Sequence, residues 1–207
     1  MNKPNNTNGK TGIIEPATDY KGRSISFYHP NGKGTGSALR LEPRINRDDD
    51  DRYNCFFLEM APQKTMATRE DGKTLPATFD WSAKITVKLT FLDIAEILTV
   101  LEGKSDKAGG DRNGIFHATG GMNTLITFQR NTEQRKYYLG LSCKRNTSDA
   151  PRKINMIINE VEATGLRCLL QAGLFFITFP SMLRGYHMTA TKLNATPPQA
   201  SGQKVAA

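Results

Sequence analysis

Apolar and polar residues alternate through much of the first half of the chain, which predicts β-strands. The period of two is clearest in residues 37–44, where Leu39 and Leu41 face one way and Arg40 and Glu42 face the other. The strand-like segments of this half are residues 23–29, 37–44, 53–60 and 78–89. Loops are expected between them, at residues 31–36, 48–51 and 62–76.

From residue 92 the pattern changes to that of a helix. Leu92, Ile97, Leu98 and Leu101 recur at helical spacing, and Gly103 follows the last of them. A second set of strand-like segments then occupies residues 115–118, 124–130, 136–144 and 153–158. It leads into a second predicted helix, residues 161–172, which we expect Gly173 to close.

The two sets of elements correspond at an offset of 69 residues. Ile85 falls on Ile154 and Ile97 falls on Leu166, and the order of elements is the same in both sets. The sequence therefore predicts an α+β domain of two antiparallel four-stranded sheets with two helices, in which a unit of four strands and a helix occurs twice.

The ends of the chain differ from its middle. Residues 1–21 and 189–207 hold few large apolar side chains and are rich in Asn, Thr, Pro, Gly and Ala. Such segments bury too little surface to offset the entropy of ordering, so we expect flexible tails on both sides of one folded domain at residues 22–188.

Several features bear on location. The first residues resemble neither a secretory signal nor an organelle transit peptide. The most apolar run, residues 169–183, is too short to span a bilayer and is predicted to be a core helix followed by a buried tail. Cys55, Cys143 and Cys168 are widely spaced, as is typical of thiols in a reducing compartment. We expect a cytoplasmic protein without membrane contact.

Charge favours an acidic partner. The net charge is +8, and residues 104–157 hold ten Lys or Arg against four Asp or Glu, which places +6 of that total in one part of the chain. A basic chain of this kind binds nucleic acid more readily than an anionic membrane. The alternative is a basic surface that serves only solubility.

The segment 136–144 offers a surface for a flexible strand. Lys136, Tyr138 and Lys144 share one face with Gly140 and Ser142, so cations can meet phosphates while a base stacks on the ring. An ordinary solvent-exposed face would have a similar pattern. The residues predicted to contact nucleic acid are Lys33, Arg40, Lys84, Lys88, Arg130, Lys136, Tyr138, Lys144 and Arg145.

Residues for catalysis are hard to assemble. His29, His117 and His187 have no acidic or cysteine neighbour at useful spacing and are interpreted as structural. The acidic run at residues 48–51 lies between two arginines and is interpreted as a solvated loop, although a nuclease could use it. Residues 32–36 lack the order of a phosphate-binding loop. We predict no enzyme activity, no metal and no cofactor.

Five motifs in the same order resemble the Whirly family of single-stranded-DNA-binding proteins, over about residues 31–182. They are Lys33-Gly34-Thr35-Gly36-Ser37-Ala38-Leu39-Arg40-Leu41-Glu42-Pro43, Phe79-Asp80-Trp81, the strand and helix at 84–103, Phe116-His117, and the apolar segment 175–180. The resemblance implies two crossing four-stranded sheets, a homotetramer, and DNA lying along sheet edges between protomers. It would place the apolar helix stripes, including Leu92, Leu98, Leu101, Leu166 and Leu170, between protomers.

The chain departs from the plant pattern of that family. Thr35-Gly36 stands where the strand motif has its second lysine, the loops are longer, and we expect no transit peptide. These differences favour a phage or bacterial member of the family. It would be similar to the transcription regulators of lytic phages that encode their own RNA polymerase. That polymerase would then be a partner in the cytoplasm of the bacterial host.

The leading hypothesis is a sequence-tolerant single-stranded DNA-binding protein that acts in transcription regulation, replication or recombination. An RNA-binding or annealing factor is the alternative within the same class, since stacking and phosphate contacts serve both nucleic acids. A protein-interaction module with a basic surface is the alternative from another class.

Overall fold

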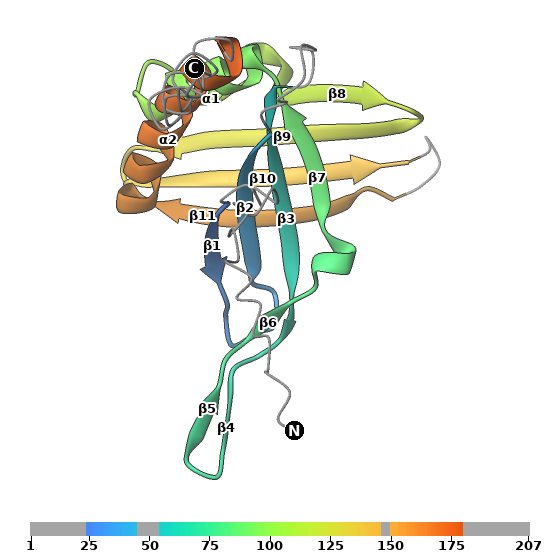
Figure 1. Cartoon of the computed structure of the whole chain (residues 1–207). Coiled ribbons are helices and arrows are strands. Elements are labelled where there is room, and N and C mark those ends of the chain that lie inside the picture. The colour runs from blue at the N-terminus through green and yellow to red at the C-terminus, as the bar shows by residue number, and fades with distance from the viewer. Residues whose placement is uncertain (1–23, 45–53, 146–149, 180–207) are drawn as a thin grey trace, which may run out of the picture.

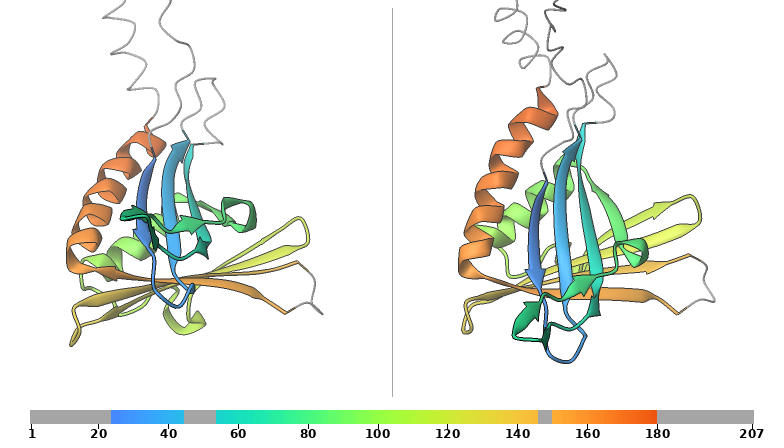
Figure 2. Two further views of the ribbon diagram at one scale, coloured as in Figure 1. Left: turned by 90° about the horizontal axis from the view of Figure 1, so that it is seen from below. Right: turned by 60° about the horizontal axis from the view of Figure 1, so that its bottom comes forward.

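The computed structural model describes residues 24–44, 54–145 and 150–179. The predicted tails at residues 1–21 and 189–207, both ends of the predicted domain 22–188, and the acidic run at 48–51 lie outside these ranges. Within them, two antiparallel sheets cross each other, and two helices lie together at one end of the pair (Figures 1 and 2).

The first sheet has β3 at its centre. Its strands are β1 (Ile25–His29), β2 (Ser37–Arg44), β3 (Cys55–Thr65), β6 (Thr78–Phe79) and β7 (Ile85–Leu89). They lie in the order β1-β2-β3, and both β6 and β7 pair with the far edge of β3. The second sheet has the order β11-β10-β9-β8. Its strands are β8 (Ile115–Thr119), β9 (Met122–Asn131), β10 (Lys136–Lys144) and β11 (Arg152–Asn159).

The single strand predicted at residues 78–89 is in fact two strands. A 3₁₀ turn, η2 (Trp81–Ala83), separates β6 from β7, and the Asp80 carboxylate caps this turn by accepting hydrogen bonds from the backbone N–H groups of Ser82 and Ala83. Because β6 and β7 pair with different parts of the same edge of β3, they share one position in the sheet, and the first sheet has the four strand positions that were predicted.

A hairpin stands where a loop was predicted at residues 62–76. Strands β4 (Thr68–Glu70) and β5 (Lys73–Leu75) pair across Asp71 and Gly72, which have φ values of 49° and 77°. Positive φ at both central residues is the geometry of a two-residue turn that suits the twist of a hairpin. This hairpin projects from the first sheet at the end opposite the helices (Figure 1).

Both helices begin with a capping box. In α1 (Phe91–Leu101) the Thr90 hydroxyl accepts from the Asp93 N–H, and the Asp93 carboxylate accepts from the Thr90 N–H. Asn159 and Glu162 form the same arrangement at the start of α2 (Glu160–Thr178). These caps satisfy backbone donors that have no partner within the helix.

The predicted end of the second helix at Gly173 is wrong. Gly173 lies buried within α2, where a Cβ atom would come within 2.2 Å of Cζ of Phe56. The helix continues for five residues, and Ile177 is buried in the core. Gly173 is therefore present because β3 approaches the helix closely.

The core lies between the inner faces of the sheets and is closed by the helices. The largest side chains that are almost completely buried include Phe56, Phe128, Leu39, Leu41, Met60, Ile126 and Ile158. Leu98, Leu101, Leu166 and Leu170 also pack into this core. Most of the stripe residues expected between protomers are thus buried within one chain, whereas Leu92 is 69% exposed.

The order of elements confirms a repeated unit, since four strand positions precede each helix. The predicted offset of 69 residues holds only for the last strand and the helix, because Phe91 of α1 falls on Glu160 of α2, whereas Ile25 of β1 falls on Ile94 inside α1. The Gln171 side chain donates to Glu102 Oε1 at 2.9 Å, and these residues are 69 positions apart. The two halves also exchange histidine–carboxylate contacts: His29 on β1 contacts Glu162 of α2 at 2.6 Å, and His117 on β8 contacts Asp93 of α1 at 3.1 Å. Each histidine thus ties the first strand of one unit to the helix of the other, as two units related by an approximate two-fold axis would do.

One described helix, α2, is long and apolar enough to span a bilayer by length and composition alone. Ala163, Leu166, Leu170 and Ile177 on this helix are buried against the rest of the chain. That packing is typical of an amphipathic helix with one side on the core. The buried tail predicted after it is wrong in the described residues, because the helix continues to Thr178 and Phe175, Phe176 and Phe179 are exposed.

Candidate nucleic-acid interface

Strand β10 separates its side chains as the sequence predicted. Tyr137, Leu139 and Leu141 are buried, whereas Lys136 and Tyr138 are exposed on the opposite face. The second sheet therefore has one face in the core and one face directed away from it.

The strand register arranges the outward residues in rows. Tyr138 lies opposite Gln129 and Ile157, Gly140 lies opposite Thr127 and Asn155, and Ser142 lies opposite Leu125 and Lys153. Phe116 of β8 extends the last row because it pairs with Leu125. We call this surface the outer face, and it comprises Phe116, Leu125, Thr127, Gln129, Lys136, Tyr138, Gly140, Ser142, Lys144, Lys153, Asn155 and Ile157.

The outer face combines apolar contact area with cations at its ends. Tyr138, Ile157 and Phe116 are 36%, 49% and 58% exposed. Lys136 lies beyond the Tyr138 row at one end, and Lys144 and Lys153 lie at the other end. Among the residues that the structure describes, no carboxylate forms an ion pair with these three lysines. Within the described ranges, their charge is thus not neutralised by an ion pair.

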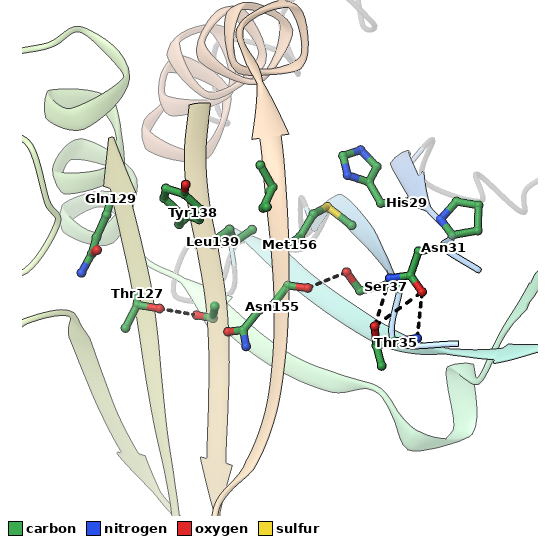
Figure 3. Close-up of a pocket in the computed structure, with 14 residues that line it drawn as sticks. His29, Asn31, Thr35, Ser37, Thr127, Gln129, Tyr138, Leu139, Asn155 and Met156 are labelled. Carbon is green, nitrogen blue, oxygen red and sulfur yellow. Dashed lines mark hydrogen bonds between the residues drawn. The ribbon is translucent and has the colours of Figure 1, made fainter. Parts of the chain in front are cut away.

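A depression of about 630 Å³ opens on the outer face (Figure 3). Tyr138, Gly140 and Asn155 line it from the sheet, and residues 29–31 and 35–37 line the other side. The Ser37 hydroxyl donates to the Asn155 carbonyl at 2.7 Å, which fixes the start of β2 against β11. The depression thus lies where the turn between β1 and β2 borders the outer face of the second sheet.

The turn that borders the depression is rigidly built. The Asn31 side-chain oxygen accepts from the backbone N–H groups of Lys33 and Thr35, both at 3.0 Å. The Gln63 side chain accepts from the Asn31 and Gly36 N–H groups and donates to the Asn31 carbonyl. Lys33, one of the predicted contacts, is exposed on this turn.

Two predicted contacts, Arg40 and Lys84, are engaged within the protein. Lys84 Nζ lies 2.5 Å and Arg40 Nη1 lies 3.7 Å from the Glu59 carboxylate, which is buried on β3. The Arg40 guanidinium also lies 4.1 Å from the ring centre of Trp81, a cation–π contact that holds both side chains within the first sheet. Both residues belong to the first sheet, so the structure does not bring them to the outer face.

The other residues predicted to contact nucleic acid lie at different parts of the fold. Lys88 is exposed on β7 of the first sheet and has an interaction partner of its own. Arg130 has the same parity as Phe128 on β9 and lies beside Gly103, on the side of the sheet opposite Tyr138. Arg145 directly follows β10 and is exposed next to Lys144. Only Lys136, Tyr138 and Lys144 of the predicted set lie on the outer face itself.

Several outer-face residues were missed from the sequence. Lys153, Asn155 and Ile157 alternate with buried residues on β11, so the period of two could have shown that they share a face. That this face continues the one of Tyr138 depends on the pairing of β10 with β11. Strand pairing is a long-range property that the local pattern does not contain.

In the described part of the chain, the His, Cys, Asp and Glu side chains do not gather into a second candidate site. No group of three or more His, Cys, Asp or Glu with the geometry of a metal site occurs in the described ranges. Burial raises the pKa of the Cys55 thiol, an effect that Lys88 and Arg44 partly oppose. The Ser82 hydroxyl, together with backbone donors, lowers the pKa of the Asp80 carboxyl. His29 and His117 both have carboxylate partners that tie strands to helices, in agreement with a structural role.

Comparison with known proteins gives the fold. No protein-family model matches the sequence, and no curated protein matches it. Among solved structures, WHY1 from Arabidopsis thaliana has 16% sequence identity and a TM-score of 0.60, with 90% of this chain and 100% of that chain covered. The chain has the Whirly fold.

Two further structures share the Whirly fold with this chain. The plant transcriptional regulator PBF-2 has 19% identity and a TM-score of 0.53, covering 85% of this chain and 88% of that chain. A guide-RNA-binding protein complex bound to a guide RNA has 22% identity and a TM-score of 0.51, covering 76% of this chain and 92% of that chain. At these identities the likeness concerns the architecture, and function has to be argued from the surface.

Proposed function

We propose that this protein binds single-stranded nucleic acid on the outer face of its second sheet, with DNA as its main ligand. The observation that carries the proposal is the outer face itself, where the Tyr138 ring and Ile157 are partly exposed between Lys136 and Lys153. Phosphates of a flexible strand would meet the lysines while bases pack on the apolar residues.

The surface favours a single strand over a duplex for a physical reason. In a duplex the faces of the bases are stacked on one another, so Tyr138 and Phe116 would find no base to contact. An unpaired strand can turn its bases toward the sheet, and stacking tolerates every base because each one has a flat aromatic face. We therefore propose a binder that is tolerant of sequence.

RNA is the second candidate. It is supported by the fold shared with the guide-RNA-binding complex and with MRP1/MRP2 of trypanosoma bruciei, at 22% and 23% identity. DNA is placed first because the motifs at residues 33–43 and 79–81 resemble those of single-stranded-DNA-binding proteins.

The wider setting is proposed on the same resemblance. The protein would act in transcription regulation, replication or recombination, as a homotetramer in the cytoplasm of a bacterium or of a phage-infected host, with an RNA polymerase as a partner. Exposed Phe175, Phe176 and Phe179 at the end of α2 and Leu92 on α1 offer apolar area for contacts between protomers. We propose binding without catalysis.

The test is a titration of fluorescent oligo-dT, a matched RNA and duplex DNA, with and without magnesium. We expect binding of the single strands, tighter for DNA, weak binding of the duplex, and intact oligonucleotides at the end. Tighter binding of RNA than of DNA would make RNA the main ligand and DNA the second candidate. Cleavage that depends on magnesium, or no binding of any strand, would contradict the proposal.

A further inference from the structure

The depression on the outer face is lined without lysine, arginine or carboxylate side chains among the described residues. Its polar lining is formed by hydroxyls, side-chain amides and one histidine. The cations lie around it, with Lys33 on the adjoining turn and Lys136 and Lys153 on the sheet. A neutral, hydrogen-bonding hollow between cations fits the base of a nucleotide whose phosphates lie outside it.

Gly140 creates the floor of this hollow. A Cβ atom at this position would come within 2.5 Å of Thr127 Oγ1 and 2.7 Å of Asn155 Oδ1. The absence of a side chain on β10 therefore lets two polar side chains lean in from the neighbouring strands β9 and β11 (Figure 3). The Thr127 hydroxyl donates to the Gly140 carbonyl at 3.4 Å, which leaves its oxygen able to accept.

The side-chain amide of Asn155 can form hydrogen bonds with a ligand. Its backbone carbonyl accepts from Ser37, but its side-chain amide has no hydrogen-bond partner in the part of the chain that the structure describes. The Gln129 amide, one row away beside Tyr138, is in the same situation. An amide presents a donor and an acceptor side by side, which matches the pairing edge of a nucleobase.

We propose that the depression binds one unpaired base of the bound strand, with the Asn155 amide on its pairing edge and the Tyr138 ring on its flat side. The amide can turn over and exchange its donor and acceptor, so the site accepts any base but requires that the pairing edge is free. The inference rests on the proposed function and adds to it a site that recognises bases by hydrogen bonds as well as by stacking.

The experiment compares two ligands and three proteins. The ligands are fluorescent oligo-dT and an abasic strand of the same length, which keeps the sugars and phosphates only. The proteins are the wild type, Asn155→Ala, and the control Asn123→Ala. Asn123 also points outward, opposite Lys144, but lies outside the depression, so its loss removes an amide without touching the site.

We expect Asn155→Ala to weaken the binding of oligo-dT about two- to tenfold, the range of one neutral hydrogen bond, and to leave the binding of the abasic strand unchanged. Gly140→Ala should have the same selective effect, because its Cβ meets only the ends of the Thr127 and Asn155 side chains. Asn123→Ala should show no loss that is confined to oligo-dT, because Asn123 lies on the same face but outside the depression.

Each other outcome overturns the inference in a recognisable way. An equal loss on both ligands would mean that Asn155 contacts the backbone of the strand, and no loss on either would mean that the depression is not used. In both cases the wild type still binds oligo-dT and the proposed function stands. A wild type that binds neither DNA nor RNA would refute the proposed function together with the inference.

Discussion

Residues of the same type have different roles in this molecule because of their cross-strand neighbours. Lys84 and Lys136 look alike in the sequence, since each begins a segment with a period of two. In the structure Lys84 is paired with Glu59, whereas Lys136 lies exposed beside the Tyr138 row. The alternation predicted which face each residue occupies, but the presence of Glu59 opposite Thr86 depends on strand pairing and could not be predicted.

Substitutions of Tyr138 test whether its ring stacks on the bases of the bound strand. Replacing Tyr138 by Ala should cost about 1–3 kcal/mol of binding free energy for oligo-dT, because a stacking surface is removed. Replacing it by Phe should cost little, since the ring remains and only the hydroxyl bond to Gln134 Oε1 is removed. Fluorescence anisotropy measures both, and equal losses from the two variants would show that the ring is not a stacking surface.

Cys55 makes the stability depend on alkaline pH. Burial raises the pKa of its thiol in the folded state, so the folded chain holds this proton more tightly than the unfolded chain does. The associated stability is complete below the ordinary thiol pKa and is lost as the pH rises through the raised one. Urea unfolding across this range should therefore show a decline that is smaller in Cys55→Ala. An identical decline in both proteins would contradict the assignment.

At the scale of elements, α2 shows how packing overrides a local signal. A glycine after an apolar stripe normally ends a helix, and the sequence predicted that end at Gly173. The glycine instead accommodates the Phe56 ring, and the helix continues to Thr178. A glycine at this position favours a helix end locally, but its contact with β3 allows the helix to continue.

Two glycines of α2 provide a matched pair. Gly173→Ala places a Cβ against the Phe56 ring and should destabilise the fold by about 1–3 kcal/mol. Gly165→Ala meets nothing within 4 Å and should stabilise it by about 0.5–1 kcal/mol through higher helix propensity. The midpoints of urea unfolding report both changes, and a stabilising Gly173→Ala would show that the close approach is absent.

Other elements show where the sequence was sufficient. The bounds of β2 and β10 agree with the predicted segments 37–44 and 136–144, because alternation is strong in both. The hairpin at residues 68–75 was missed because all of its strand residues except Leu75 are polar, and those on both faces are exposed, so no apolar alternation marks it. Its Asp71-Gly72 pair is the local signal that could have revealed it.

At the scale of the whole molecule, the repeat explains the architecture. Two similar units exchange a histidine–carboxylate pair in each direction, so the first strand of each unit is joined to the helix of the other. The offset of 69 residues predicted that the chain contains two similar units. It could not predict that each histidine pairs with a residue of the other unit, because that contact depends on how the units pack.

The proposed assembly is testable by mass. We expect light scattering to give about four times the chain mass of 22.9 kDa, because Phe175, Phe176 and Phe179 expose apolar area that a partner would cover. Phe175→Ser with Phe176→Ser should lower this mass while circular dichroism stays that of the folded chain. A wild type with the mass of one chain at micromolar concentration would exclude the tetramer.

The central claim is that a strand of nucleic acid lies on the outer face. Its most direct test is the dependence of oligo-dT affinity on salt for two double variants of equal charge. Lys136→Ala with Lys144→Ala removes cations of the outer face. Lys73→Ala with Lys104→Ala removes exposed cations on β5 and after α1, away from that face.

The slope of log affinity against log salt measures the number of phosphates that the protein neutralises. We predict that the outer-face variant binds several-fold more weakly and that its slope falls by about 0.7 for each phosphate that the variant no longer neutralises, while the control variant keeps the wild-type slope. An unchanged slope in the folded outer-face variant, or an equal change in both variants, would contradict the account.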